Sequence, residues 1–334
     1  MSVDLRQCVD YQKFMRRLGW VVEGVGGGQV EYVKRLPFFP LISVMKIQRV
    51  KYAIDFSLVN QESKKYRVLF IKLEPKVISG KKGSKEWTRK MRKNGFKEDK
   101  TSLLATKTRR IDLRVSEKKL LEQMKSKTRY NIGLAERRGI KAQVISGEKL
   151  DKKLIDDFYK VFKENSKRIK ILTYPRGWFE KLVESFGKNC FMVMACDGGC
   201  FNNRKSERVL SRVFPQKHLQ GAPFWGFPNP RHPLNSPYLV GVALFLVAGD
   251  TVYYSHNGTT DEGRKNFGSN LMVWEGVREA KRRKLKWFDF GGVYDSRYKN
   301  TKNWKGFSRF KQGFGGEEVT YLGSFVKWLP FLRK

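Results

Sequence analysis

The sequence predicts an α/β fold with mixed β-sheets and two domains. The chain has 334 residues, which is too long for one ordinary compact domain and comfortable for two. Hydrophobic residues make up 40% of the chain and aromatic residues 13%, more than a disordered chain contains. From Lys141 onward, strand-like and helix-like segments alternate, and this alternation is typical of α/β proteins.

In the first 140 residues, short strand-like runs alternate with basic connectors. Residues 66–73 are rich in strand-forming side chains and predict a β-strand, as do residues 110–115. A short basic helix is expected around residues 87–93. Residues 116–138 predict one long amphipathic helix, because a serine can cap its first turn and a glycine follows its last residue.

The second half of the chain predicts five strands and three helices. Apolar runs of strand length occupy residues 142–145, 191–196, 240–247, 251–255 and 285–290. Amphipathic periodicity predicts helices at residues 151–166, 178–186 and 264–283. The last of these helices ends in several lysines and arginines, which match the negative end of the helix dipole.

One segment, residues 199–237, interrupts this alternation. It contains several prolines, paired aromatic residues and many basic residues, and it separates two strands that a short hairpin would normally join. We interpret it as an inserted basic loop. Cys196, Cys200, His218 and His232 could be read as zinc ligands, but their spacing matches no standard zinc module. No metal and no cofactor are therefore expected.

The net charge of +37 indicates a polyanionic partner. Nucleic acid, an anionic membrane face and a phosphorylated precursor all fit this charge. The basic residues are spread along the whole chain, so the positive field is expected to belong to the folded body. The alternative interpretation is a basic surface without a specific partner.

The cysteines and the N-terminus predict a cytoplasmic protein. The four cysteines form no CxxC pair, and residues 1–14 contain no apolar leader, so the thiols are expected to be reduced. The longest apolar run, residues 239–249, is too short to span a bilayer. Any contact with the inner membrane face is therefore expected to be peripheral and electrostatic.

Three motifs together suggest a family. They are SKTRYNIGLAERRG at residues 126–139, WFDFGG at residues 287–292 and FKQGFGG at residues 310–316. Each motif alone could be an amphipathic helix, a core strand or a glycine-rich turn. In this order and at this spacing they resemble the FemABX peptidyltransferases, which build the amino-acid bridges of bacterial cell walls. The resemblance covers nearly the whole chain except residues 199–237.

The resemblance implies two domains that are each similar to a GNAT acyltransferase. The first would comprise residues 1–140 and be completed by residues 317–334, and the second would comprise residues 141–316. The implied reaction transfers an amino acid from aminoacyl-tRNA to an amine of a peptidoglycan precursor. That acceptor would be UDP-MurNAc-pentapeptide or lipid II, and the reaction would need no cofactor.

The resemblance also implies catalytic residues. Lys311 matches the lysine that the family places near the reacting carbonyl, where a fixed positive charge would stabilise the oxyanion. We expect it to face solvent in a cleft, with the backbone carbonyl of Phe310 orienting a donor group. His256 lies where the family commonly has a tyrosine. It is expected to hydrogen-bond substrate or accept a proton, although a structural role is an equal alternative.

Five further residues are expected to bind substrate. Family members hold the precursor with an arginine and a tyrosine at the start of a helix, and the matching positions here are Tyr174 and Trp178. Arg176 lies between them and could replace the missing charge. Arg17 corresponds to a basic residue near the N-terminus of the family. Tyr254 precedes His256 on the same predicted strand.

Two rival functions fit parts of the sequence. An acyl-CoA-dependent N-acyltransferase of the same fold would carry a pyrophosphate loop at residues 264–269, with a glycine at position 267. Phe267 occupies that position and argues against coenzyme A. A non-enzymatic nucleic-acid-binding protein would explain the charge, but the chain has no known RNA-binding signature.

Overall fold

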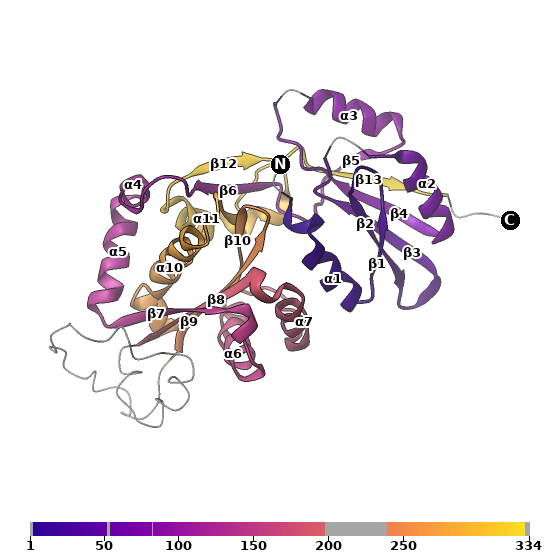
Figure 1. Ribbon diagram of the computed structural model, residues 1–334. Helices are drawn as coiled ribbons and strands as arrows, with labels where there is room; N and C mark the ends of the chain where they lie inside the picture. The colour runs from indigo at the N-terminus through magenta and orange to yellow at the C-terminus, as the bar shows by residue number, and fades with distance from the viewer. Residues whose placement is uncertain (1–2, 52–53, 82, 198–238, 331–334) are drawn as a thin grey trace.

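The computed structural model consists of two lobes, each built around a mixed β-sheet (Figure 1). It describes residues 3–51, 54–81, 83–197 and 239–330. The expected α/β class with two mixed sheets is confirmed. In this part of the chain no helix is long and apolar enough to cross a bilayer.

The N-terminal lobe contains a six-stranded sheet. Its strand order is β1 (Val21–Gly24), β2 (Val30–Leu36), β3 (Phe39–Gln48), β4 (Val68–Glu74), β13 (Ser324–Trp328) and β5 (Lys97–Asp99). Its helical segments are η1 (Leu5–Gln7), α1 (Val9–Arg17), α2 (Phe56–Lys65) and α3 (Ser84–Lys93). Strand β13 comes from the C-terminus and pairs antiparallel with both β4 and β5.

The C-terminal lobe contains a seven-stranded sheet. Its strand order is β12 (Glu317–Thr320), β6 (Lys107–Asp112), β11 (Trp287–Gly292), β10 (Thr251–Thr259), β9 (Leu239–Ala248), β8 (Cys190–Asp197) and β7 (Ile140–Ser146). Only β10 and β11 are parallel, and the other neighbouring strands in this sheet are antiparallel. Strand β6 thus lies in this sheet although it precedes residue 140. The predicted domain boundaries themselves stay a prediction.

Helices cover both faces of the seven-stranded sheet. One face packs against α4 (Glu117–Gln123), α5 (Ser126–Arg137) and α10 (Gly268–Arg282), with α11 (Lys305–Gln312) beside them. The other face packs against α6 (Lys152–Arg168) and α7 (Arg176–Phe186). Helix α1 of the other lobe joins this second core through Phe14 and Met15, so one apolar cluster connects the two lobes.

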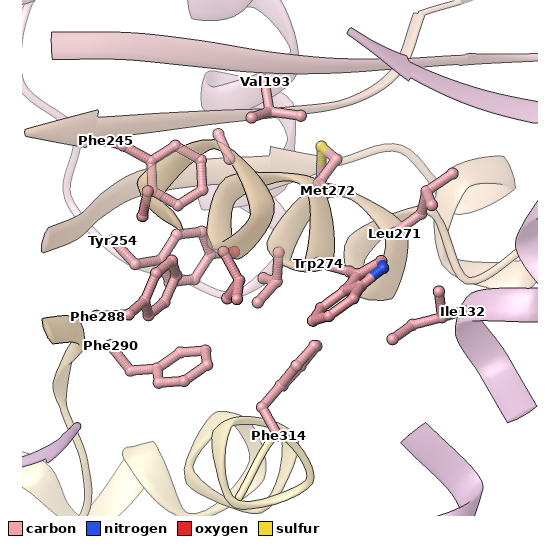
Figure 2. Close-up of a cluster of buried hydrophobic side chains, with 14 of the residues drawn as sticks. Ile132, Val193, Phe245, Tyr254, Leu271, Met272, Trp274, Phe288, Phe290 and Phe314 are labelled. Carbon is pink, nitrogen blue, oxygen red and sulfur yellow. The ribbon is translucent and has the colours of Figure 1, made fainter. Parts of the chain in front are cut away.

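Aromatic residues form a large part of the core under α10 (Figure 2). The rings of Phe191 and Phe245 stack with centroids 4.8 Å apart. Helix α10 approaches them closely because residue 276 is a glycine, where any Cβ would collide with the Phe245 ring. Such close packing, in which one added methyl group is not accommodated, makes this core intolerant of larger residues.

Two predicted helices are each divided in the structure. The helix expected at residues 116–138 is broken at Met124, which is extended and buried, while the Lys125 N–H donates to the Gly313 carbonyl at 2.9 Å. The helix expected at residues 264–283 is divided into α9 (Asp261–Lys265) and α10. Phe267 separates them with a left-handed φ of 58°. Tertiary contacts therefore override helical periodicity at both points.

The inserted loop expected at residues 199–237 lies outside the described residues, together with Cys200, His218 and His232. The strands on either side of it are antiparallel neighbours, with Cys196 opposite Leu239. The sheet therefore needs only a short turn at this point.

We predict that replacing residues 199–237 with a short Gly-Ser turn will leave a folded protein. The hydrogen bonds between β8 and β9 are complete without the segment, and a shorter loop lowers the entropic cost of closure. Circular dichroism during heating should show a single cooperative transition. Loss of soluble protein would mean that the segment supplies part of a core.

Candidate active site

A β-bulge in β10 decides where His256 points. Tyr254 lies opposite Phe245, whereas His256 lies opposite Leu244, so Ser255 is an extra residue in the strand. Because side chains alternate along a strand, one extra residue moves the following side chain to the other face of the sheet. Tyr254 consequently packs in the core under α10, and His256 packs on the side of α6 and α7.

His256 is enclosed by aromatic rings. The centroids of Trp178 and Phe179 lie 5.2 Å from its ring, and those of Phe162 and Tyr174 lie about 6 Å away. Its Nδ1 is hydrogen-bonded to Ser255 Oγ at 2.8 Å. Burial, reinforced by the positive charge of Arg6, lowers the pKa of His256 to about 3. A ring with this pKa accepts protons poorly, which argues against the proton-accepting role. Hydrogen bonding to substrate and a structural role both stay predictions for His256.

Tyr174 and Trp178 form an aromatic stack beside His256. Their rings are almost parallel, with centroids 4.1 Å apart and an interplanar angle of 8°. Phe14 of α1 supports Trp178 from the other lobe at 4.9 Å. Tyr174 remains 49% exposed. The stack therefore presents one open ring surface at the junction of the lobes, suited to a planar or apolar group.

The two arginines expected to bind substrate are already paired with carboxylates. Arg176 lies 2.6 Å from Asp156 and 2.8 Å from Glu180. Arg17 is exposed on α1 and forms an ion pair with Glu184 of α7. Their charges are thus largely compensated, and Arg17 helps to join α1 to α7. Neither arginine therefore has an uncompensated charge with which to bind a substrate beside the aromatic stack.

Tyr254 lies in the core, although it was expected to contact substrate. Its side chain is 6% exposed and packs near Phe245 and Phe290, with centroids 5.4 and 6.1 Å away (Figure 2). Burial raises the pKa of its hydroxyl. The bulge therefore separates Tyr254 from the side of the sheet that carries His256.

Three basic residues of the N-terminal lobe were not indicated by any sequence motif, and one of them, Arg6, interacts electrostatically with Tyr174 and His256. Arg6 of η1 donates to the Tyr11 hydroxyl, and its charge contributes to lowering the pKa of both His256 and Lys46. Lys46 lies 4.2 Å above the Trp20 ring, and Lys34 lies 5.6 Å from the same ring. Burial lowers the pKa of Lys46 to about 7. No motif distinguishes these three among the 69 lysines and arginines of the chain.

Lys311 is buried, although it was expected to face solvent. It is 9% exposed, and its Nζ donates to the Gly292 carbonyl at 2.6 Å. Burial lowers the pKa of Lys311 to about 8, and the negative charge of Asp289 opposes this shift. Lys311 therefore still carries its charge at neutral pH. Asp289 is also buried, accepts from Thr108 and from Gly291 N–H, and was not identified from the sequence.

The three sequence motifs meet around Lys311. Lys311 of FKQGFGG bonds to Gly292 of WFDFGG. Thr128 of SKTRYNIGLAERRG touches the backbone of FKQGFGG so closely that a Cβ at Gly313 would overlap its hydroxyl. Phe310 packs on Phe314 at 5.3 Å, and its carbonyl accepts from Gly313 N–H at 3.0 Å. That bond uses the carbonyl that was expected to orient a donor.

The candidate residues thus fall into two groups at one end of the parallel pair β10/β11. His256, Tyr174 and Trp178 lie together on the side of α6 and α7. Lys311 and Phe310 lie on α11, which packs with the core under α10. The carboxyl ends of parallel strands are a common location for active sites. The arrangement offers a fixed charge in one group and an aromatic surface in the other.

The N-terminus of α10 fits coenzyme A poorly. Phe267 adopts the left-handed conformation that a glycine would take there. The Arg138 guanidinium lies 5.5 Å from the Phe267 ring and donates to the Lys265 carbonyl at 2.7 Å. A pyrophosphate needs open backbone N–H groups at such a helix start. The bulky ring at this position argues against coenzyme A.

Comparison with known proteins identifies one family. The FemAB family model matches residues 28–197 and 235–330. No curated protein matches the chain. Residues 28–197 include the first of the three motifs, and residues 235–330 include the other two.

Solved structures share the fold. The crystal structure of FemX has a TM-score of 0.74 and 17% identity, covering 98% of this chain and 93% of that one. The C-terminal domain of a putative lysylphosphatidylglycerol synthetase from Agrobacterium fabrum has a TM-score of 0.57 and 10% identity, covering 96% and 87%. L-PGS from Bacillus licheniformis has a TM-score of 0.54 and 8% identity, covering 96% and 91%.

We predict that His256 stays neutral between pH 5 and pH 8, roughly the range in which an ordinary histidine titrates. Its imidazole NMR signals, assigned by comparison with His256→Gln, should not shift in this range.

The low pKa also makes stability depend on pH. In the unfolded chain His256 binds a proton near pH 6.5, whereas in the folded protein it binds one only near pH 3. The free energy of unfolding should therefore fall as pH drops from about 6.5 towards 3. His256→Gln should weaken this dependence, and a midpoint near 6.5 in the folded protein would contradict the prediction.

Proposed function

The chain belongs to the FemAB family, and on that premise we propose that it is an aminoacyltransferase acting on a peptidoglycan precursor. The donor would be aminoacyl-tRNA, and the acceptor an amine of the precursor's stem peptide. One observation carries the proposal. The three motifs that resemble the family are far apart in sequence yet meet around one buried, charged lysine, Lys311.

The chemistry requires little beyond positioning and charge. The acceptor amine attacks the ester carbonyl of the donor, a new C–N bond forms, and the ester C–O bond breaks. The proton lost by the amine is taken up by the departing ribose oxygen. Negative charge develops on the carbonyl oxygen in the transition state, where a preorganised cation is most effective. With a pKa of about 8, Lys311 can supply that cation at neutral pH.

The positive net charge of the chain supports aminoacyl-tRNA as the donor. The chain has a net charge of +37, and a tRNA is a polyanion that such a surface attracts strongly. The poor fit of α10 to coenzyme A supports a donor other than an acyl-CoA thioester. Acetyl-CoA is therefore the appropriate negative control donor in every transfer assay.

The side chains at the junction between the lobes support the proposed acceptor. The open face of Tyr174, the neutral ring of His256 and the charge of Arg6 lie near one another there. Such a surface suits a precursor that combines apolar or planar groups with phosphates. UDP-MurNAc-pentapeptide and lipid II both have these groups, so both should be offered as acceptors.

We predict that Lys311→Met lowers the single-turnover rate of transfer by about 10²–10³. The loss should appear in the rate and leave tRNA binding unchanged, because the charge acts on the transition state. The variant should also be less stable by about 1–3 kcal/mol, since the Gly292 carbonyl loses its donor. Lys305→Met, which removes an exposed lysine from the same helix, is the matched control.

The pH dependence adds a second test of Lys311. Its charge is lost as pH rises through about 8, so any acceleration that depends on this charge should disappear above that pH. Lys311→Arg should retain part of the rate at higher pH, because a guanidinium stays protonated. Equal losses of tRNA binding and rate in Lys311→Met would make the lysine a phosphate contact without a part in the chemistry.

We further predict that tRNA binding weakens steeply with salt. Each phosphate contact should contribute about −0.7 to −0.9 to the slope of log K against log salt concentration. Fluorescence anisotropy of labelled tRNA at increasing NaCl measures this slope. An affinity that does not change with salt would exclude an electrostatic tRNA surface.

A further inference from the structure

The end of the six-stranded sheet carries large apolar residues in solvent. Phe38 is 90% exposed, Phe39 60% and Leu41 69%, and all three lie at the turn between β2 and β3 or directly after it. Isolated exposed apolar residues are common on proteins, but a contiguous group usually marks an interaction surface. Pro37 and Pro40 flank the two phenylalanines and restrict the backbone of the turn.

The strand register shows that this hairpin extends beyond the rest of the sheet. Strand β4 pairs with β3 from Ser43 onward, and β1 pairs with β2 only as far as Val33. The residues from Leu36 to Ile42 therefore extend past both neighbouring strands. At about 3.3 Å per residue, the tip projects roughly 10 Å from the sheet. We call this projection, residues 36–42, the apolar tip.

Strand β13 adds a tryptophan to the same end of the sheet. Lys34 of β2 pairs with Val44 of β3, and Val44 pairs with Phe70 of β4. Phe70 in turn pairs with Trp328 of β13, so Trp328 lies at the same level of the sheet as Lys34. Trp328 is 65% exposed, and its ring lies 5.1 Å from that of Phe70. Tryptophan is enriched where water meets lipid headgroups, and phenylalanine is common among the apolar side chains by which peripheral proteins enter the membrane interface. Two separate segments of the chain thus place aromatic residues at one sheet end.

The charges around the apolar tip are positive. Arg35, Lys64 and Arg67 are exposed, and the Arg67 carbonyl accepts from Ser43 N–H at the start of the paired part of β3. The sequence contains no acidic residue from Tyr32 to Ile54, from Lys64 to Leu73, or after Glu318. An apolar projection with a basic surround is complementary to an anionic lipid bilayer and repels other basic surfaces.

We propose that the apolar tip and Trp328 dock this protein on an anionic membrane surface, with Phe38 and Phe39 inserted among the lipid headgroups. The basic residues at the sheet end draw the protein to the bilayer, and the aromatic side chains then hold it there. Either attraction alone is weak, and the combination gives stable but reversible binding. The proposal does not depend on the transfer reaction and can be tested without it.

The test is sedimentation of the full-length protein with vesicles. Wild type should bind vesicles made of equal parts phosphatidylglycerol and phosphatidylcholine, and bind pure phosphatidylcholine vesicles much more weakly. The double variant Phe38→Ser/Phe39→Ser keeps every charge and should lower the partition coefficient at least about tenfold. Leu103→Ser, which removes a similarly exposed apolar residue from another loop, should bind as wild type does.

A fluorescence measurement reports insertion directly. Brominated lipids should quench part of the tryptophan emission of wild type, and Trp328→Phe should lose that part. Because the substituted side chains are exposed, melting temperatures of all variants should match wild type.

Three results would overturn the proposal. The first is equal binding by the double variant and wild type, which would assign membrane binding to the general positive charge. The second is no binding of wild type to anionic vesicles. The third is concentration-dependent self-association that disappears in the double variant while vesicle binding persists, which would make a second copy of this chain the occupant of the tip.

Discussion

The position of the two lobes depends on the last strands of the chain, because one continuous segment contributes a strand to each sheet. Strand β12 pairs with β6 in the seven-stranded sheet, and β13 then lies between β4 and β5 in the six-stranded sheet. The short connection between them is fixed by the Arg49 guanidinium, 3.7 Å from the Tyr321 ring, and by a hydrogen bond from Ser324 N–H to the Tyr298 hydroxyl. Neither sheet is complete without this segment.

That arrangement creates the candidate site. Phe14 from the N-terminal lobe supports Trp178 from the C-terminal lobe, and Arg6 lies near enough to both His256 and Lys46 to lower their pKa values. These residues are far apart in the sequence and come from both lobes. A small rotation of one lobe would separate them, so the shared C-terminal segment positions the site as well as completing the sheets.

Burial decides which charges are available to a substrate. Arg17 and Arg176 lie near the surface and are compensated by carboxylates on α6 and α7. Lys311 is held by a carbonyl and Lys46 by an aromatic ring, and burial lowers the pKa of both. A buried cation whose charge is not fully balanced by nearby carboxylates is stabilised when an anion binds, because the anion replaces the favourable interactions with water that burial removed. The interior lysines, rather than the surface arginines, are thus suited to meet developing or resident negative charge.

The sequence by itself determined the α/β class, most strands of the seven-stranded sheet and the order of the three motifs. These features depend on local periodicity and on residue types in short segments, both of which a sequence displays directly. Only the tertiary structure decided the breaks at Met124 and Phe267, the bulge that separates Tyr254 from His256, and the burial of Lys311. It also brought Arg6 to the site, which no motif marked. Each of these depends on contacts between residues far apart in the chain, such as Lys125 with Gly313 and Lys311 with Gly292, and local periodicity carries no information about such contacts.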